Sequence, residues 1–329
     1  MSLKIIRQGV LDTVQDWGRY GHQHLGINCN GAMDRFSMQL ANALLGKDLN
    51  APVLEIHFPC SQILFEKEAI FCITGGDFLP TINGQPVPLH HPIAVNKKTV
   101  LRFEKLRSGA RCYISFFNEL KLEKWMNSYS TNLKAGAGGY KGRNLLKDDV
   151  ILFNNGLKIS NLLHSGDFAV LPWKASDVVD SRNEIEFIIG SEWHWLASES
   201  QELFLEQWFQ ITNEADRMGF QLAAQCLKTK HNDQLVSSAV CFGTVQLLPN
   251  GQLIILMADH QTAGGYPRIA YVISAHLPIL AQKKPNDVIK FKMTSLEEAE
   301  KKMHNQKKYL HQLQIACKFR IEEFLNAHL

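Results

Sequence analysis

Several residues that could carry out chemistry lie together in the segment ADHQTAGGYP, residues 258–267. Asp259 and His260 are adjacent and could move protons as a pair. Gln261 offers an amide that can hydrogen-bond a polar ligand, and the pair Gly264–Gly265 lets another group approach the backbone closely. A plain turn between two strands would use the same Gly-Gly-Tyr-Pro sequence. The segment alone therefore leaves catalysis and a structural turn equally open.

A second candidate site lies near the N-terminus, in DTVQDWGRYGHQHLGI. Gln15, Asp16 and Arg19 fall within five residues of one another, beside Gly18 and Gly21. A Gly-Arg-x-Gly turn exposes backbone N–H groups next to a guanidinium, which can bind a carboxylate or a phosphoryl oxygen. Asp16 could instead simply hold Arg19 in place.

Other familiar site motifs are incomplete. The histidine pairs at 22/24 and 90/91 have no further ligand at zinc-site spacing, and HExxH does not occur, so no metal is predicted. The glycine-rich AGAGGYKGR, residues 135–143, lacks the GK[ST] of a P-loop and is better explained as a flexible connector. The sequence has no GxSxG elbow, which gives little support to a serine nucleophile.

The chain repeats itself. Residues 34–41 read DRFSMQLA and residues 216–223 read DRMGFQLA, identical at five of eight positions at an offset of 216 − 34 = 182. The same offset matches the strand-like LKIIRQG near the N-terminus to IEFIIGS, and Asp77 to Asp259. This regularity predicts an internal duplication with two domains of one fold.

The strand signals within each copy are short apolar or alternating runs with Asn-Gly turns, and the DRxxxQLA segment has helical spacing. We therefore expect a mainly β protein with two small β-barrels, each carrying one helix that starts at Asp34 or Asp216. Gly219 lies within the first turn of the helix expected at Asp216, which suggests that a backbone or a ligand approaches closely there. The expected domains are barrel 1 at 1–125, a Gly-rich connecting segment at 126–183, barrel 2 at 184–294 and a helical tail at 295–329.

Composition limits the class of function. The 329 residues carry a net charge of +3 with 45% hydrophobic residues, and no basic cluster with interleaved aromatics suggests nucleic acid as a partner. Apolar runs are too short for a membrane span, and the N-terminus lacks the apolar core of a signal peptide. Seven cysteines without a CxxC pair indicate buried thiols, not disulfides. These features favour a globular, cytoplasmic protein.

The order of VQDWGRYGHQHLGI, NGAMD, VLEI, STNLKAGAGGYKGR, EADRMGFQL and GTVQLLPNGQLIILMADHQTAGGYPRIAYVI resembles the allophanate hydrolase subunit 2 family. That family is also known as the C-type subunits of 5-oxoprolinase and as the KipI antagonists. The resemblance implies two cyclophilin-like β-barrels in tandem. It further implies partnership with a KipI-like B-type subunit and an A-type subunit, and ATP-dependent opening of 5-oxoproline to L-glutamate. ATP would be bound by the complex or by this chain.

The resemblance also places the family's site motifs on particular residues. The implied catalytic residues are Asp16, Arg19, Arg217, Asp259 and His260. Arg19 and Arg217 would steady negative charge, while Asp16 or Asp259 would move protons. The implied substrate-binding residues are Gln15, Asp34, Asp216, Met218, Gln246, Gln261, Gly264, Gly265 and Tyr266.

Two other functions stay open. Related domains form half of a biotin-dependent carboxyltransferase, as in urea amidolyase, and the absence of Met-Lys-Met means that a separate biotin carrier would be needed. A non-catalytic regulator that binds a KipI-like kinase inhibitor is the third alternative. The ITGGDF segment resembles a cyclophilin strand, but the Phe-His-Arg arrangement of prolyl isomerases is not seen, so that activity is not expected.

Overall fold

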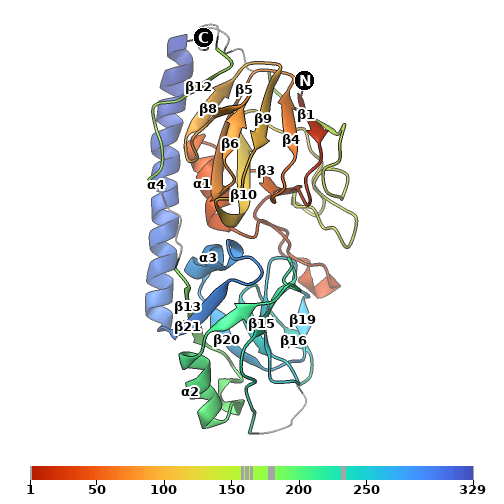
Figure 1. Cartoon of the computed structure of the whole chain (residues 1–329), viewed down its shortest axis with the longest axis vertical. Coiled ribbons are helices and arrows are strands. Elements are labelled where there is room, and N and C mark those ends of the chain that lie inside the picture. Colours follow the sequence, from red (N-terminus) through yellow and green to blue (C-terminus); the bar gives the residue numbers. More distant parts are fainter. Residues whose placement is uncertain are drawn as a thin grey trace. The chain divides into compact units, whose positions relative to one another are not determined.

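The computed structural model describes residues 2–156, 159, 163, 166–176, 182–230 and 235–328 (Figure 1). Two compact units can be distinguished. Unit 1 comprises Met1–Gly18, Asp34–Val179 and Lys307–Leu329. Unit 2 comprises Arg19–Met33 and Asp180–Gln306. The short segment 19–33 therefore leaves the sequence of the first copy and folds with the second.

Unit 1 is built from two six-stranded sheets, with orders β11-β1-β4-β9-β6-β7 and β12-β8-β5-β10-β3-β2. Neighbouring strands in both sheets run antiparallel. The strands are β1 (Ser2–Arg7), β2 (Thr13–Gln15), β3 (Val53–Ile56), β4 (Gln62–Phe65), β5 (Ala69–Asp77), β6 (Pro80–Ile82), β7 (Gln85–Pro86), β8 (Pro92–Val95), β9 (Thr99–Phe103), β10 (Ser108–Phe116), β11 (Val150–Leu152) and β12 (Phe168–Val170).

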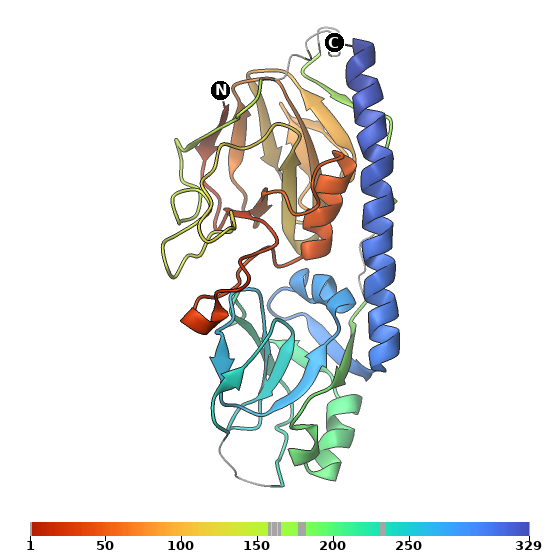
Figure 2. The same cartoon turned by 180° about the vertical axis from the view of Figure 1, so that it is seen from behind.

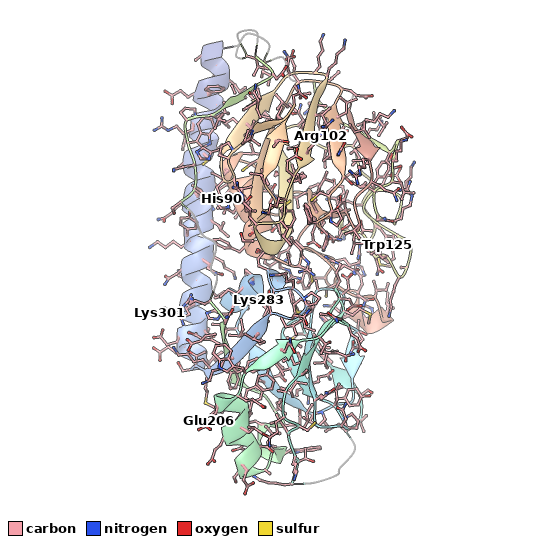
Figure 3. All side chains as sticks on the ribbon, in the orientation of Figure 1. His90, Arg102, Trp125, Glu206, Lys283 and Lys301 are labelled. Carbon is pink, nitrogen blue, oxygen red and sulfur yellow. The ribbon has the colours of Figure 1, made fainter. Side chains whose placement is uncertain are left out.

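The core of unit 1 lies between the inner faces of these sheets. Phe65 on β4, Phe71 on β5 and Phe116 on β10 are fully buried, with ring centroids 5.2 to 6.4 Å apart. Burying each ring contributes about 1.5–3 kcal/mol. Side chains on β9 alternate, since Leu101 is buried while Arg102 is exposed and labelled in Figure 3. This period of two is the strand signal seen in the sequence.

Two helices cover one face of unit 1. Helix α1 (Arg35–Leu44) and the second part of α4 (Leu296–His328) lie side by side in Figures 1 and 2. Leu40 of α1 and Leu310 and Ile321 of α4 belong to one buried cluster with residues of the sheet. The predicted C-terminal helix is confirmed as a single helix of 33 residues. Ser295 caps its start, because its hydroxyl accepts the N–H of Glu298 at 3.2 Å.

The segment 126–183, expected to connect two barrels, contributes to unit 1. Its strand β11 pairs with β1, and its strand β12 pairs with β8. Within it, the glycine-rich 135–143 is a closely packed loop. A Cβ on Gly142 would lie 1.9 Å from the carbonyl oxygen of Gly136, and one on Gly139 would lie 1.9 Å from Thr131 Oγ1. The glycines allow the loop to fold on itself, which corrects its interpretation as a flexible connector.

Unit 2 contains a closed seven-stranded barrel in the order β13-β20-β17-β18-β15-β14-β21 and a separate pair, β16-β19. The β13–β21 pair is parallel and closes the barrel. Its strands are β13 (Glu184–Ile189), β14 (Phe209–Ile211), β15 (Gly219–Ala223), β16 (Ser238–Ala239), β17 (Thr244–Leu247), β18 (Leu253–Leu256), β19 (Ala263–Gly264), β20 (Arg268–Val272) and β21 (Val288–Met293).

The interior of the unit 2 barrel is aromatic at one end. Phe204 from α2 (Ser198–Glu206) stacks on Phe291 of β21 at 4.6 Å, and Phe187 and Phe209 pack around them. A further helix is α3 (Leu277–Ala281), and short 3-10 turns are η1 (Gln23–Leu25), η3 (Trp193–Trp195) and η4 (Ser274–His276). The chain is thus mainly β, as the sequence predicted.

The offset of 182 survives in the strands but not in every element. The bounds of β1 and β13 differ by 182 residues, as do those of β4 and β17. The second DRxxxQLA segment, however, is strand β15, so the predicted helix at Asp216 is wrong. Phe220 and Leu222 are buried and alternate with partly exposed neighbours, and this strand pattern prevails over the helical spacing.

Among the described residues, none of the helices is at once long enough and apolar enough to cross a membrane.

Candidate functional site

Four of the polar residues of unit 2 form a connected network. The Arg19 guanidinium donates a short hydrogen bond to Asn30 Oδ1. Asn30 Nδ2 donates to Asp259 Oδ1 at 2.7 Å, and Asp259 in turn pairs with Arg217. The structure therefore brings together three of the five predicted catalytic residues, with Asn30 between them.

The Arg217–Asp259 pair has the geometry of a strong ion pair. Arg217 Nε lies 2.9 Å from Asp259 Oδ2, and Arg217 Nη2 lies 3.0 Å from Oδ1. The arginine side chain is 7% exposed and the carboxylate 14%. A two-point contact of this kind fixes the plane of the guanidinium. Asp259 therefore positions Arg217, and its oxygens are engaged in a way that suits orientation better than proton transfer.

Backbone contacts hold the two members of this pair in place. Asp259 follows β18, and its N–H donates to the carbonyl of Arg217 at 2.7 Å, just ahead of β15. Since β15 and β18 are neighbours in the barrel, the residues that extend beyond their paired ends meet. Arg217 Nη2 also donates to the Gly31 carbonyl at 2.7 Å.

The segment 19–33 supplies the other half of the network. Arg19 N donates to the Cys29 carbonyl at 2.7 Å and closes this segment into a loop. Asn28 Nδ2 donates to the carbonyls of Asp259 and His260, at 2.8 and 2.7 Å. Asn30 adopts φ 53°, a conformation that asparagine tolerates better than most residues. Asn28 and Asn30 were not among the predicted site residues, although the Asn30-Gly31 pair signals a turn.

The network contains the guanidinium groups of Arg19 and Arg217 and the carboxylate of Asp259. Arg19 is 1% exposed and Arg217 is 6% exposed. Fixed positive groups in a region with little water attract negative charge more strongly than they would in solution. The arrangement suits a ligand that carries an anionic oxygen or develops one during reaction.

His260 lies next to this network and is buried. Its Nδ1 is 2.5 Å from the carbonyl oxygen of Gln261. Because a carbonyl oxygen only accepts hydrogen bonds, Nδ1 carries the proton and Nε2 is the basic nitrogen of the neutral ring. This tautomer is the one that a general base would use through Nε2.

In the 258–267 segment, the neighbours of Gly264 and Gly265 are other parts of the protein. A Cβ on Gly264 would lie 2.7 Å from Gln246 Nε2, and one on Gly265 would lie 3.1 Å from the Leu235 carbonyl oxygen. Gly264 is also part of strand β19. The expected close approach is therefore made by the protein's own side chain and backbone.

Gln246, on β17, retains hydrogen-bonding capacity. Its Nε2 lies 3.4 Å from the Tyr266 carbonyl, while Oε1 is buried without a hydrogen-bond partner among the residues that the structure describes. An unsatisfied buried acceptor is uncommon and marks a position where a ligand donor would be favourable. Tyr266 is 43% exposed.

In unit 1, Asp16 is fully engaged in local contacts. Its carboxylate accepts hydrogen bonds from Ser128 Oγ at 2.7 Å, Ser130 Oγ at 2.5 Å, Tyr129 N at 2.6 Å and Gly18 N at 2.8 Å. Three of these donors come from a segment more than a hundred residues away in sequence. Asp16 therefore ties this segment to the end of β2, a structural task that accounts for its burial.

The other predicted residues of unit 1 are also engaged in the fold. Asp34 caps α1, since its carboxylate accepts from Ser37 N at 2.8 Å and Ser37 Oγ at 2.6 Å. Gln15 is fully buried on β2 and donates to Thr13 Oγ1 at 2.9 Å. In the described part of the chain Gln15 Oε1 has no partner.

Asp216 and Met218 form a turn ahead of β15. Asp216 is exposed, and its Oδ1 accepts from the N–H groups of Met218 and Gly219 at 2.7 and 3.0 Å. This Asx-type turn replaces the helix cap expected from the first copy. Its effect is to direct Arg217 inward and to leave Asp216 on the surface.

The described residues contain no group of three or more His, Cys, Asp or Glu side chains placed to hold a metal ion. The glycine-rich 135–143 does not fit a phosphate cradle either. A Cβ on Gly142 would meet the loop's own backbone and one on Gly139 would meet Thr131, so these two turns are packed by the protein itself.

Comparison with known proteins gives the family to which the chain is similar. Residues 25–293 match the family model described as carboxyltransferase domain, subdomain A and B. The chain is 36% identical over 311 residues to the C-type subunit of 5-oxoprolinase from Escherichia coli strain K12, covering 94% of this chain and 97% of that protein. It is 28% identical over 313 residues to urea amidolyase of Saccharomyces cerevisiae, covering 90% of this chain but 17% of that protein.

A solved structure shows the same fold. The urea amidolyase of K. lactis superimposes with a TM-score of 0.86 at 25% identity, over 95% of this chain and 20% of that chain. The urea amidolyases are thus much longer proteins that contain one region similar to this chain. The chain belongs to the family of carboxyltransferase domains with subdomains A and B, and within it is similar to the C-type subunits of 5-oxoprolinase.

Proposed function

We propose that the chain is a subunit of a cytoplasmic, ATP-dependent 5-oxoprolinase that opens 5-oxoproline to L-glutamate together with a KipI-like B-type subunit and an A-type subunit. The similarity to the C-type subunit of 5-oxoprolinase, which extends over nearly the whole of both chains, supports this choice. The single structural observation that carries it is the buried Arg19–Asn30–Asp259–Arg217 network.

The reaction requires water to add to the carbonyl carbon of a cyclic amide. The C–N bond of the ring then breaks, and the ring nitrogen takes up a proton. Negative charge develops on the carbonyl oxygen in the transition state, and fixed guanidinium groups stabilise it because they are already oriented. Arg217, held flat by Asp259, is assigned this role together with Arg19.

His260 is the proposed proton carrier. With Nδ1 bound to the Gln261 carbonyl, Nε2 accepts a proton from the attacking water. Gln246 Oε1, buried without a partner among the described residues, provides an acceptor for the N–H of the lactam ring. Asp259 acts as a positioning residue in this scheme, and Asp16 and Asp34 stabilise the fold.

When bound, ATP would supply the activation of the lactam carbonyl and would leave as ADP and inorganic phosphate. We assign its binding to the partner subunits, because the glycine-rich loop of this chain is closed on itself. The chain then contributes charge stabilisation and proton transfer to a site completed in the complex.

The test is co-expression of the chain with KipI-like and A-type subunits and measurement of L-glutamate released from 5-oxoproline and ATP. Replacing Arg217 by Met should lower kcat at least about a hundredfold. The matched control is Arg268→Met. Arg268 forms a comparable two-point pair with Glu192 in unit 2, at 2.9 and 2.7 Å, outside the network. Full activity of Arg217→Met in an intact complex would disprove the assignment.

A biotin-dependent carboxyltransferase is the second candidate, favoured by the family model and by the urea amidolyase similarity. It predicts carboxyl transfer from carboxybiotin on a separate carrier, with no glutamate released from 5-oxoproline. If the chain instead regulates a KipI-like kinase inhibitor, it should bind the B-type partner. Wild type and Arg217→Met should then be equally inactive. Glutamate release in the co-expression experiment distinguishes the 5-oxoprolinase from the other two, and an assay of carboxyl transfer from carboxybiotin distinguishes the second candidate from the third.

A further inference from the structure

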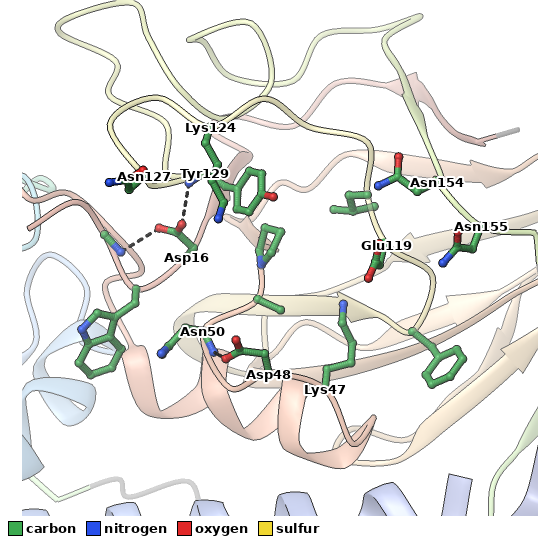
Figure 4. A pocket seen from close by; sticks show the side chains of 16 residues that line it. Asp16, Lys47, Asp48, Asn50, Glu119, Lys124, Asn127, Tyr129, Asn154 and Asn155 are labelled. Carbon is green, nitrogen blue, oxygen red and sulfur yellow. Dashed lines mark hydrogen bonds between the residues drawn. The ribbon is translucent and has the colours of Figure 1, made fainter. Parts of the chain in front are cut away.

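Unit 1 contains a cavity that the proposed reaction does not use. Its volume is about 750 Å³, within the range of small-molecule sites. Its polar lining comes from loops far apart in sequence, and Figure 4 shows these side chains around the opening. The polar residues that line it include Lys47, Asp48, Asn50, Glu119, Lys124 and Asn154.

Lys47 is the distinctive residue of this cavity. Its ammonium donates to the Phe116 carbonyl, and its own carbonyl accepts from Gln314 Nε2 at 2.6 Å. Burial lowers the pKa of Lys47 to about 8, opposed by the nearby carboxylates of Glu119 and Asp48. The half-buried ammonium of Lys47 can bind a carboxylate more strongly than a fully exposed one would.

Lys47 and Glu119 line the same space with opposite charges but form no direct ion pair in the described part of the chain. In Figure 4 the two side chains extend toward each other across the cavity. The exposed Lys124 lies near the Tyr129 ring at 5.1 Å, at another part of the wall. A molecule with a carboxylate and an ammonium could therefore bridge Lys47 and Glu119.

We propose that this cavity is a binding site for a free α-amino acid in its zwitterionic form, with the carboxylate on Lys47 and the ammonium on Glu119. Asn50 and Asn154 offer amide groups for a polar side chain of the ligand. Phosphate-rich ligands such as ATP are disfavoured because Asp48 and Glu119 repel them. The proposal does not depend on the 5-oxoprolinase reaction, since the cavity belongs to unit 1 and the network to unit 2.

Isothermal titration of the full chain with L-glutamate, with glutarate as the probe that lacks the ammonium, tests the proposal. We expect saturable binding of L-glutamate below about 10 mM and at least about tenfold weaker binding of glutarate. Lys47→Met should weaken L-glutamate binding at least about tenfold, whereas Lys97→Met, an exposed lysine of unit 1, should leave it unchanged.

Glu119→Gln provides a second test that does not depend on the folding of the Lys47 variant, because Glu119 is exposed. It should remove the preference for L-glutamate over glutarate. Absence of saturable L-glutamate binding, binding unaffected by Lys47→Met and Glu119→Gln, or ATP binding that Lys47→Met abolishes would each overturn the proposal.

Discussion

The two copies of the DRxxxQLA motif give the same residues different tasks. In unit 1, Asp34 caps α1 and the Arg35 guanidinium lies 4.8 Å from the centre of the Trp17 ring. In unit 2, Asp216 forms a surface turn and Arg217 points into a buried network. The first copy therefore uses the motif to start a helix, and the second uses it to aim a guanidinium.

The aspartates at the other end of the repeat differ in the same way. Asp77, at the end of β5, accepts from Leu79 N at 2.8 Å and lies 3.5 Å from the exposed Arg107. Asp259, its counterpart at the offset of 182, is paired with Arg217 and Asn30. A position inherited by duplication thus became part of a charged cluster in one unit only, which teaches that sequence repetition does not imply a repeated site.

The largest expected difference between the copies is the cost of removing these aspartates. Asp259→Ala leaves the buried Arg217 without its partner and should lower the free energy of unfolding by roughly 3–5 kcal/mol. Asp77→Ala removes a largely exposed pair and one N–H acceptor and should cost about 1 kcal/mol. Urea unfolding of both variants measures the two values. Similar losses would show that the buried pair contributes no more than the exposed one.

A buried carboxylate of a different kind provides the next test. Asp12 in unit 1 is fully buried and accepts from His57 N at 2.9 Å and Ser61 N at 2.7 Å. Burial raises the pKa of Asp12 from 3.8 to about 6, against the effect of its hydrogen bonds. Because the folded state holds the proton more tightly, this contribution to stability is fully present below pH 3.8 and is lost as the pH rises through 6.

The change in the free energy of unfolding from this group should be roughly 3 kcal/mol across that window. Asp12→Asn cannot titrate, so the difference in stability between wild type and this variant should shift by most of that amount, about 2.4 kcal/mol, in favour of wild type at pH 4 compared with pH 7. Chemical unfolding at a series of pH values measures it. Parallel pH profiles would mean that the burial of Asp12 does not perturb its titration.

Much of the fold could be predicted because it follows local patterns. The alternating apolar residues predict a mainly β chain, Ser295 predicts the start of α4, and Asp34 predicts the start of α1. The offset of 182 also predicted β13 from β1, because both open their copies with the same apolar alternation.

The network could be predicted only in part. Arg217 and Asp259 were suggested by sequence, but Asn30 is 229 residues from Asp259, and no periodicity indicates that pairing. The cavity was not foreseen at all, because Lys47 and Glu119 come from separate loops and neither lies in a recognisable motif. Long-range contacts between loops depend on how whole units fold, which a local pattern does not encode.

One position that differs between the two copies of the motif allows a smaller test. Ser37 in α1 corresponds to Gly219 in β15 at the offset of 182. A Cβ on Gly219 would lie 2.7 Å from Ile254 Cδ1 on the neighbouring strand. Gly219→Ser should therefore cost about 1–3 kcal/mol of unfolding free energy by overpacking. Thermal unfolding measures it, with Ala223→Ser on the same strand as the control. No loss in Gly219→Ser would mean that Ile254 adjusts freely.

The smallest expected effects concern the first residue of each motif. Asp34→Ala removes the acceptor for Ser37 N and Ser37 Oγ, so it should destabilise the chain by about 1–2 kcal/mol, while Asp34→Asn, which keeps an acceptor, should cost less. Asp216→Ala removes the exposed turn contacts to Met218 and Gly219 and should cost about 0.5 kcal/mol. Urea unfolding compares the three variants.

Glutamate release in the complex separates a structural role from a functional one. If Asp216→Ala lowers glutamate release, Asp216 contacts substrate or partner. If Asp34→Ala lowers it only in proportion to its loss of stability, Asp34 is structural. If instead Asp34→Ala lowers glutamate release by more than its loss of stability explains and Asp216→Ala leaves release unchanged, the substrate contact lies in the first copy of the motif.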